Sequence, residues 1–290
     1  HAAGSGKGVV ANVGLQLTPD LETRFYLRYR ETEHQSPGRL TQSQIDDDPT
    51  QANPANIARD AKREQPGSTW LANKTTLRLD DVSTLEMGLV YHHYPMDLME
   101  SPYRIRVDYS DISATLNYKR EHELFGLNSN TTVGWRTTTN LPSSDSKETA
   151  YQPLNANGTV YPVGTLMRKY EHQGSDNVLH VSNELELAPR LWLSSGLALI
   201  YTQREVEVTW PDTNERLDDG TWDYAPRLGL RYQLESGTEV YGNLSRSVEP
   251  PHPWSMIWGS PTRFPVSNQP WSNRQSTPVS LDNQTATTFE

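Results

Sequence analysis

Apolar and polar residues alternate along much of the chain, and this period of two constrains the fold more than any other feature of the sequence. In residues 221–235, every second residue from Trp222 to Leu234 is apolar or aromatic, and most residues between them are charged or polar. Successive side chains of a β-strand point to opposite faces, so this segment predicts a strand with one apolar face. The apolar face is aromatic near its ends and aliphatic in its middle, which is typical of a strand that crosses a hydrocarbon layer between two aromatic girdles.

The same alternation predicts further strands along the whole chain. In residues 21–30, apolar and aromatic side chains alternate with Glu and Arg, which indicates that the second face meets water. In residues 104–119 the alternation changes phase, which predicts a bulge near Ser110. Other strands are predicted within residues 9–17, 85–92, 193–201 and 239–245.

Short and long connections follow each other strictly between these segments. Short turns are predicted at residues 18–20, 80–83, 121–127, 188–190 and 235–237, and long polar connections at residues 35–68, 95–103, 140–175, 206–221 and 250–285. Loops longer than about 15 residues are uncommon in compact soluble domains. Outer-membrane barrels, in contrast, combine long extracellular loops with short periplasmic turns. The sequence therefore predicts an all-β fold, an antiparallel transmembrane β-barrel.

The number of predicted strands indicates an incomplete barrel. We expect about ten strands in five hairpins, with an eleventh that begins at residues 285–290. A single-chain barrel normally closes with an even number of complete strands, and loops this long favour a barrel wider than eight or ten strands would form. Residues 1–290 are therefore interpreted as a partial barrel domain. The alternative, a soluble β-sandwich, solenoid or propeller, is disfavoured because the sequence has no repeat of fixed period.

Composition excludes several other classes of protein. The longest mostly apolar stretch, residues 191–201, is about half as long as the roughly 20 residues that a membrane-spanning helix requires. A net charge of −10 disfavours nucleic acid as a partner, because phosphate backbones attract clusters of Lys and Arg. The absence of Cys excludes disulfides and thiol chemistry. Common nucleotide-binding, metalloprotease and hydrolase motifs are missing, so we expect no enzyme, no catalytic residue and no resident metal or cofactor.

The segment "YHHYPMDLMESPYR" is one candidate ligand site. Its two imidazoles and two thioethers could bind a soft metal, although adjacent His residues on a strand face opposite sides and only one of them can face the barrel lumen. The alternative is an ordinary strand end in which Met fills gaps. The candidate residues are His92, Tyr94, Met96, Met99, Tyr103 and Arg104. Two acidic segments, "IDDDP" and "LDDG", lack the spacing of an EF-hand and are interpreted as solvated loop charge.

The last long connection is the second candidate site. It is rich in aromatic and Arg side chains, which at a surface often mark contact with a ligand or partner. In the alternative interpretation, these rings pack on one another and keep the loop folded. The candidate residues are Trp254, Trp258, Arg263, Phe264 and Trp271. If the ligand is an anionic metal chelate, Arg263 and Arg104 would pair with its oxygen atoms.

Two segments near the end of the chain resemble the TonB-dependent receptors of the Gram-negative outer membrane. Residues 241–251, "YGNLSRSVEPP", are similar to a strand with the pattern Y-x-N-x-S-x-S-x-x-P in those receptors. The final residues, "VSLDNQTATTFE", are similar to their segment L-x-P-E-x-A-x-x-Y/F-E, with Asn283 and Gln284 in place of the usual Pro and Glu. The hairpin pattern extends the resemblance to the whole chain.

The resemblance implies a monomeric 22-stranded barrel in the cell outer membrane, in contact with its lipid and lipopolysaccharide. An N-terminal plug domain would fill the lumen and carry the segment that contacts TonB; the plug and the second half of the barrel are not in these residues. Such receptors import ferric siderophores or similar metal chelates, haem or cobalamin, driven by the TonB complex of the inner membrane. Inward charges would face the plug or the permeation path: Arg24, Arg28, Arg30, Arg227 and Arg231. A passive porin, or an adhesin or secretion barrel, remains an alternative.

Overall fold

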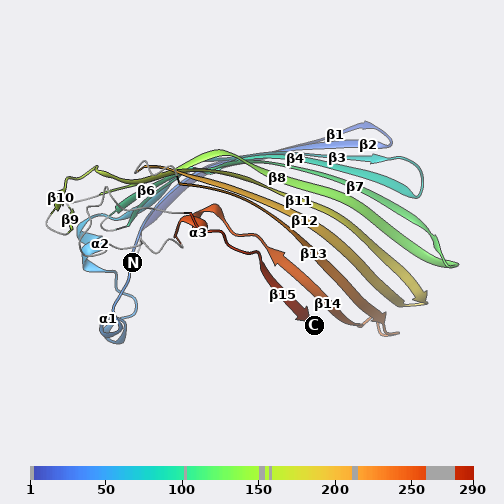
Figure 1. Cartoon of the computed structure of the whole chain (residues 1–290). Coiled ribbons are helices and arrows are strands. Elements are labelled where there is room, and N and C mark those ends of the chain that lie inside the picture. Colours follow the sequence, from blue (N-terminus) through green and yellow to red (C-terminus); the bar gives the residue numbers. More distant parts are fainter. Residues whose placement is uncertain (1–2, 101–102, 150–153, 157–158, 211–214, 259–277) are drawn as a thin grey trace.

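The computed structural model describes residues 3–100, 103–149, 154–156, 159–210, 215–258 and 278–290. One antiparallel sheet of 13 strands dominates it, in the order β1-β2-β3-β4-β7-β8-β11-β12-β13-β14-β15, with β5 and β6 attached at one end (Figure 1). The strands of the main path are β1 (Gly4–Thr18), β2 (Leu21–Gln35), β3 (Lys62–Arg78), β4 (Ser83–His93), β7 (Ser110–Leu124), β8 (Leu127–Thr149), β11 (Leu166–Ala188), β12 (Leu191–Trp210), β13 (Arg216–Gln233), β14 (Glu239–Glu249) and β15 (Gln284–Phe289). The all-β prediction is confirmed, and β15 is the predicted eleventh strand.

Smaller elements gather at the end of the sheet opposite the short turns (Figure 1). They are β5 (Met96–Glu100), β6 (Tyr103–Asp108), the two-stranded sheet of β9 (Leu154–Ala156) and β10 (Thr159–Tyr161), and the helices α1 (Gln42–Asp47), α2 (Pro54–Ala58) and α3 (Pro253–Trp258). Among the described residues, no helix is long and apolar enough to cross a membrane.

The short turns lie where the sequence predicts them. β7 and β8 are joined by Phe125 and Gly126, with φ angles of 56° and 77°. Positive φ at both central residues is the geometry of a two-residue hairpin turn that matches the right-handed twist of the strands. Because Gly adopts positive φ without a steric cost, Gly126 eases this turn.

Several connections predicted as long loops are in fact strand. β8 and β11 are 23 residues each and extend through much of the segment 140–175, for which the alternation pattern predicts a loop. β12 reaches Trp210 and β13 begins at Arg216, which shortens the predicted connection 206–221 in the same way. At the ends of these strands away from the short turns, apolar and polar residues no longer alternate, but the backbone pairing continues. Neither face of the sheet is required to be apolar there. Hydrophobic periodicity alone therefore underestimates the strands.

The bulge predicted near Ser110 is an interruption of the strand. β6 ends at Asp108 and β7 begins at Ser110, so that Tyr109 stands between two strands that both pair with β8. The four residues from Asp108 to Asp111 therefore face the five from Asn140 to Ser144. The Tyr109 side chain leaves the ladder and stacks on histidine rings, as described below.

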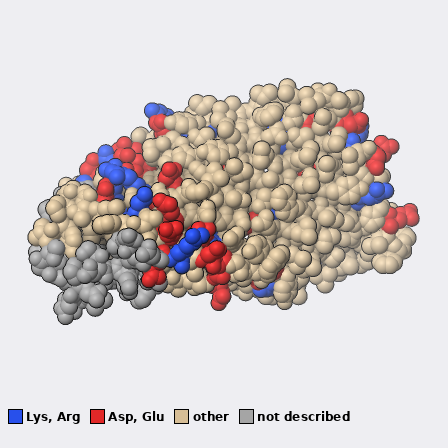
Figure 2. Space-filling model, turned by 45° about the horizontal axis from the view of Figure 1, so that its top comes forward, with Lys and Arg blue, Asp and Glu red and all other residues tan. Residues whose placement is uncertain are grey.

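The convex face of the sheet is apolar. Along β13 its outward side chains include Trp222, Leu228 and Tyr232, which are 71%, 54% and 43% exposed. Figure 2 shows Lys, Arg, Asp and Glu gathered at two ends of this face, with a band of other residues between them. A broad apolar band with charges only at its edges fits a hydrocarbon layer.

A small buried core lies on the opposite, concave side, where α3 lies beneath the sheet (Figure 1). Met256 and Ile257 of α3 are each 1% exposed and pack against Val206 and Val208 of β12. The core is completed by Tyr170, with Leu217 and Leu281 at its border. This core fixes the last described helix to the inner wall of the sheet.

Candidate functional site

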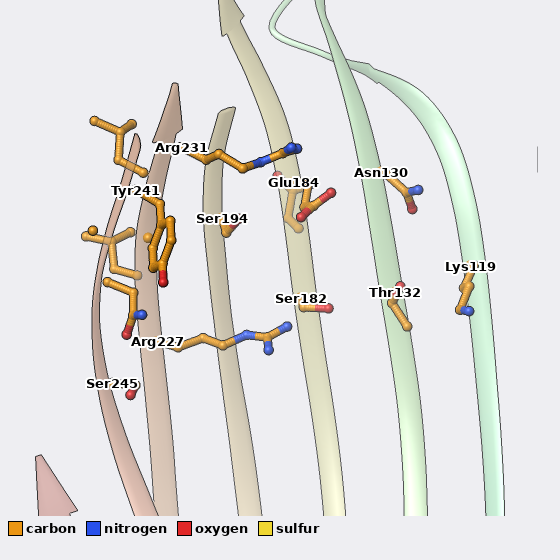
Figure 3. Close-up of a pocket in the computed structure, with 16 residues that line it drawn as sticks. Lys119, Asn130, Thr132, Ser182, Glu184, Ser194, Arg227, Arg231, Tyr241 and Ser245 are labelled. Carbon is orange, nitrogen blue, oxygen red and sulfur yellow. The ribbon is translucent and has the colours of Figure 1, made fainter. Parts of the chain in front are cut away.

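Polar side chains from alternate strand positions cover the concave face. They surround a hollow of about 700 Å³ between β7 and β14. Figure 3 shows the side chains of Arg227 and Arg231 extending across the neighbouring strands. Residues that line this concave hollow are Lys119, Asn130, Thr132, Ser182, Glu184, Ser194, Arg227, Arg231, Tyr241, Asn243 and Ser245.

The two arginines of the concave hollow differ in their partners. Arg231 pairs with Glu239 at 3.0 Å and lies over the ring of Trp192, with 4.3 Å between guanidinium carbon and ring centroid. Within the described part of the chain, Arg227 makes no ion pair. Its guanidinium has room because Gly196 lies beside it, where an added Cβ would come within 2.7 Å of Arg227 Nε. Arg227 is therefore a positive charge on the concave face that no described carboxylate pairs with.

Arg227 belongs to a row of basic side chains across the concave face. The charges of Arg227 and of Arg136 both act on His180, which lies between them on β11. Gly134 makes space for this imidazole, since a Cβ there would lie 2.4 Å from His180 Cε1. Arg136 also has no ion pair with any described residue. Such a row attracts anions.

The predicted inward arginines of β2 lie on this same face. Phe25 and Leu27 line an apolar groove on the convex side, so the alternating positions of Arg24, Arg28 and Arg30 face inward. Arg24 is 3.4 Å from Glu22, and the guanidinium carbon of Arg28 lies 5.8 Å from the ring centroid of Trp70. The structure thus brings all the predicted inward charges to the concave face.

A second cluster of polar and aromatic side chains lies on the concave face, at the end of the sheet away from the short turns. We call it the rim cluster: Tyr109, Asn140, Asp145, Tyr170, His172 and His252. Its centre is dry, because Asp145 and His172 are 2% and 3% exposed. Asp145 accepts a hydrogen bond from the Tyr170 hydroxyl, and its other oxygen is 3.9 Å from His172 Nε2.

Three rings stack in the rim cluster. The centroid of the Tyr109 ring is 6.1 Å from that of His172 and 5.9 Å from that of His252. The Tyr109 hydroxyl accepts a hydrogen bond from the Asn140 amide. Although part of the His252 side chain is exposed, its desolvation against the rim cluster lowers its pKa below the usual range; His172 and Arg204 act in the same direction and Asp145 opposes the shift. A neutral His252 is thus favoured at neutral pH.

The residues predicted from "YHHYPMDLMESPYR" are spread over three elements. On the concave face, His92 Nδ1 is 3.6 Å from Asp111, and the Tyr94 ring meets the His92 ring edge-on. Met96 and Met99 are three positions apart on β5, which points their side chains to opposite faces. The structure therefore does not bring both thioethers to His92, and no described group of three His, Asp or Glu side chains could hold a metal ion.

The two predicted residues of β6 have partners within the chain. The Arg104 guanidinium donates hydrogen bonds to both carboxylate oxygens of Asp97, at 2.8 and 3.0 Å from Nε. The ammonium of Lys147 lies 3.9 Å from the ring centroid of Tyr103. Arg104 is thus held in place by a carboxylate before any ligand arrives.

The aromatic candidates of the last connection fall largely outside the described part. Trp254 and Trp258 belong to α3, but their side chains are not described. Arg263, Phe264 and Trp271 lie outside the described residues. The neighbouring Met256 and Ile257, which are not among the candidate residues, pack against Val206 and Val208 of β12. Sequence reasoning missed the rim cluster because its members come from four distant segments with no shared motif.

The comparison with known families decides the classification. Residues 11–290 match the family described as TonB dependent receptor-like, beta-barrel. The chain belongs to this family. The TonB-dependent receptor barrel is an outer-membrane fold of a transporter family, not of enzymes. In such barrels short turns face the periplasm, the convex face meets lipid and the concave face lines the lumen.

Solved structures with the same fold are distant in sequence. The ferric citrate transporter FecA in the unliganded form has 13% identity and a TM-score of 0.72 over 86% of this chain and 36% of its own. The ferric-catecholate import receptor Fiu of E. coli K12, in its closed form, has 10% identity and a TM-score of 0.64 over 99% and 48%. The copper transporter OprC has 14% identity and a TM-score of 0.61 over 92% and 40%.

The receptor barrel therefore spans between about a third and a half of the length of these structures. No curated protein sequence matches the chain. At such low sequence identity, these structures establish the fold of the chain and do not identify its ligand.

Proposed function

We propose that this chain forms the first part of the barrel of a receptor that imports a ferric siderophore or a similar metal chelate, coupled to TonB. The observation that carries the proposal is the row of basic side chains on the concave face, Arg136 and Arg227 beside His180, where neither arginine has an ion pair with a described residue. A barrel wall with free positive charges attracts anionic solutes and suits a ligand whose metal is wrapped in oxygen donors.

The ligand class is consistent with the similar structures. They are a ferric citrate transporter, a ferric-catecholate import receptor and a copper transporter. Metal transport is common to the three, and iron is the commoner metal among them. We propose the same class of cargo for this receptor.

First contact with the chelate is proposed at the end of the barrel away from the turns. The rim cluster offers aromatic rings, and we propose that the residues predicted from the sequence also contact the chelate: His92, Tyr94, Met96, Met99, Tyr103, Arg104, Trp254, Trp258, Arg263, Phe264 and Trp271. Arg104 is held by Asp97, so a chelate carboxylate would compete for it with a preorganised partner.

Energy coupling is proposed to act through a plug domain outside residues 1–290. Carboxylates of such a plug would pair with Arg227, whose charge is free, and with Arg231 in competition with Glu239. The TonB complex would contact the plug and move it. In a passive porin, no such partner is needed.

Growth experiments test this function. A strain that lacks the complete gene is grown on ferric siderophores, ferric citrate, haem and copper, zinc or nickel chelates as sole sources of the metal. Growth that fails on one chelate, and returns with the gene only when TonB is present, supports the proposal. Binding of the same chelate by the purified receptor is then titrated. Growth independent of TonB on the restoring chelate would favour the porin, and normal growth of the deletion strain on every chelate would refute import.

A further inference from the structure

We infer that the convex face of this receptor carries a binding site for an anionic phospholipid of the periplasmic leaflet. Arg120 would hold the phosphate, and an apolar groove higher on the same face would hold an acyl chain. The convex face takes no part in the proposed import. The inference of a lipid site can therefore be tested independently of the identity of the transported ligand.

Arg120 faces the lipid. Its neighbour Lys119 lines the concave hollow, and successive side chains of a strand point to opposite faces. Arg120 is exposed and lies opposite Ser83, the first residue of β4 after a short turn. The guanidinium therefore lies at the level of the periplasmic turns, where the headgroups of the inner leaflet lie.

Among the described residues, no carboxylate lies within ion-pair distance of Arg120, although the charge of Asp80 in the neighbouring short turn acts on it. Other cations at this end of the sheet are paired: Arg78 is 2.7 Å from Asp20 and Lys119 is 3.0 Å from Glu86. Arg120 instead donates to the Tyr118 hydroxyl at 3.3 Å, and within the described chain it forms no ion pair. A cation at the edge of the hydrocarbon layer requires an anion or water, and a guanidinium matches the paired oxygens of a phosphate.

Uncharged polar groups surround Arg120 on the same outward face. Thr131 lies directly opposite it on β8, and its hydroxyl is 2.7 Å from His122 Nε2. The Asn183 amide donates to the hydroxyls of Ser129 and Thr131 at 2.6 and 2.8 Å. Such a patch is unusual on a face otherwise apolar, and it suits a headgroup that carries hydroxyls, as the glycerol of phosphatidylglycerol does.

An apolar groove lies on the same face above this patch. It has a volume of about 480 Å³, and its lining includes Ala11, Phe25, Leu27, Leu71, Leu89 and Ile112. Leu89 pairs with Ala114, six positions before Arg120 on β7. Six residues cover about 20 Å along a strand, or about 14 Å along the membrane normal at a tilt of about 45°.

This distance matches one phospholipid. One leaflet contributes about half of the roughly 30 Å hydrocarbon thickness. A lipid with its phosphate at Arg120 would pass over Leu116, which is 43% exposed, and end in the groove. The headgroup patch and the groove are separate observations, and their spacing joins them into one site.

Lipid retention by the complete receptor tests the site. The receptor is purified in mild detergent, and dipalmitoyl phosphatidylglycerol, dipalmitoyl phosphatidylcholine or inorganic phosphate is added before native mass spectrometry. We expect one retained phosphatidylglycerol, with retention lowered roughly tenfold in Arg120→Gln. The matched control, Lys119→Gln, removes a cation from the adjacent position on the lumen side and should retain the lipid as the wild type does.

Ala114→Phe, opposite Leu89 at the edge of the groove nearest to Arg120, tests the groove separately. It should weaken retention of dipalmitoyl phosphatidylglycerol and leave the short-chain dihexanoyl lipid unchanged. Each variant is accepted only with wild-type barrel assembly in heat-modifiability gels; if Arg120→Gln fails to assemble, Arg120→Lys, which keeps the charge but loses the bidentate geometry, replaces it and should show intermediate retention. Equal retention in Arg120→Gln and wild type, equal retention of phosphatidylcholine, or full competition by inorganic phosphate would overturn the inference.

Discussion

The guanidinium carbon of Arg231 on β13 lies 4.3 Å from the ring centroid of Trp192 on β12. Glu239 holds the same guanidinium at 3.0 Å, whereas Arg227 on the same face of β13 has no described ion pair. One strand thus presents a fixed cation near the turns and a free cation further into the lumen. The two positions should respond differently to mutation.

Charge reversal at Arg227 should reduce transport. We expect Arg227→Glu to lower uptake of an anionic chelate by about tenfold, because it replaces an attracting charge on the lumen wall with a repelling one. Uptake of the radiolabelled chelate by whole cells measures this. Arg190→Glu, in the turn between β11 and β12, is the control and should leave uptake unchanged. Normal uptake by Arg227→Glu would show that the free charge serves neither the plug nor the permeation path.

A charge on the convex face should destabilise the barrel. Leu228 is 54% exposed and belongs to the outward row of β13, so Leu228→Arg should cost about 2–4 kcal/mol of folding free energy in a bilayer. Ser194→Arg, on the lumen side, should cost much less. Denaturant titration of the receptor in lipid vesicles compares the two, and equal losses would contradict the assignment of the faces.

Removal of the core contacts should release α3 from the wall. Met256 is 1% exposed, and Met256→Ala should weaken docking of α3 by about 2–4 kcal/mol through loss of contacts and a cavity. Limited proteolysis should then cut near α3 more rapidly, while the strands of the barrel stay protected. Ile57→Ala, an exposed residue of α2, serves as the control. Unchanged cleavage in Met256→Ala would mean that this core does not hold the helix.

Acid should loosen the same segment. The pKa of His252 is depressed below its ordinary value of 6.5, so the native arrangement favours the neutral imidazole. This contribution to stability is complete above pH 6.5 and is lost as the pH falls through the depressed pKa, because protonation places a second charge beside His172 and Arg204. Proteolysis near α3 should therefore accelerate between pH 7.5 and pH 5 in the wild type.

The variant His252→Phe isolates that effect. Phe keeps an aromatic ring beside Tyr109 and has no proton to bind, so its cleavage rate should depend less on pH than that of the wild type. An identical pH dependence in both proteins would assign the effect to another group of the rim cluster.

The alternation in residues 221–235 predicted β13 and its two faces, because a lipid layer outside and water inside impose opposite polarity on successive residues. The same reasoning placed the arginines of β2 and β13 on the inner face. It could not predict the outer parts of β8 and β11, where both faces are polar and only backbone pairing defines the strand.

The rim cluster was beyond sequence reasoning for a different reason. Tyr109 and His252 are 143 positions apart in the chain, and only the curvature of the sheet and the packing of α3 bring their rings within 5.9 Å. The interruption at Tyr109 appears in the sequence as a change in the phase of the apolar–polar alternation. That pattern alone does not distinguish a β-bulge from a residue whose side chain leaves the pairing with β8.

The long pairing of β8 with β11 has a consequence for how such a surface can change over time. Backbone hydrogen bonds hold this outer part of the two strands, and its exposed side chains are free from the demand for hydrophobicity that governs the lipid-facing band. Apart from the buried Asp145, Tyr170 and His172, residues there can be exchanged with little effect on the shape of the wall. The exposed positions of this outer part can therefore vary in sequence while the paired backbones of β8 and β11 preserve the architecture of the wall.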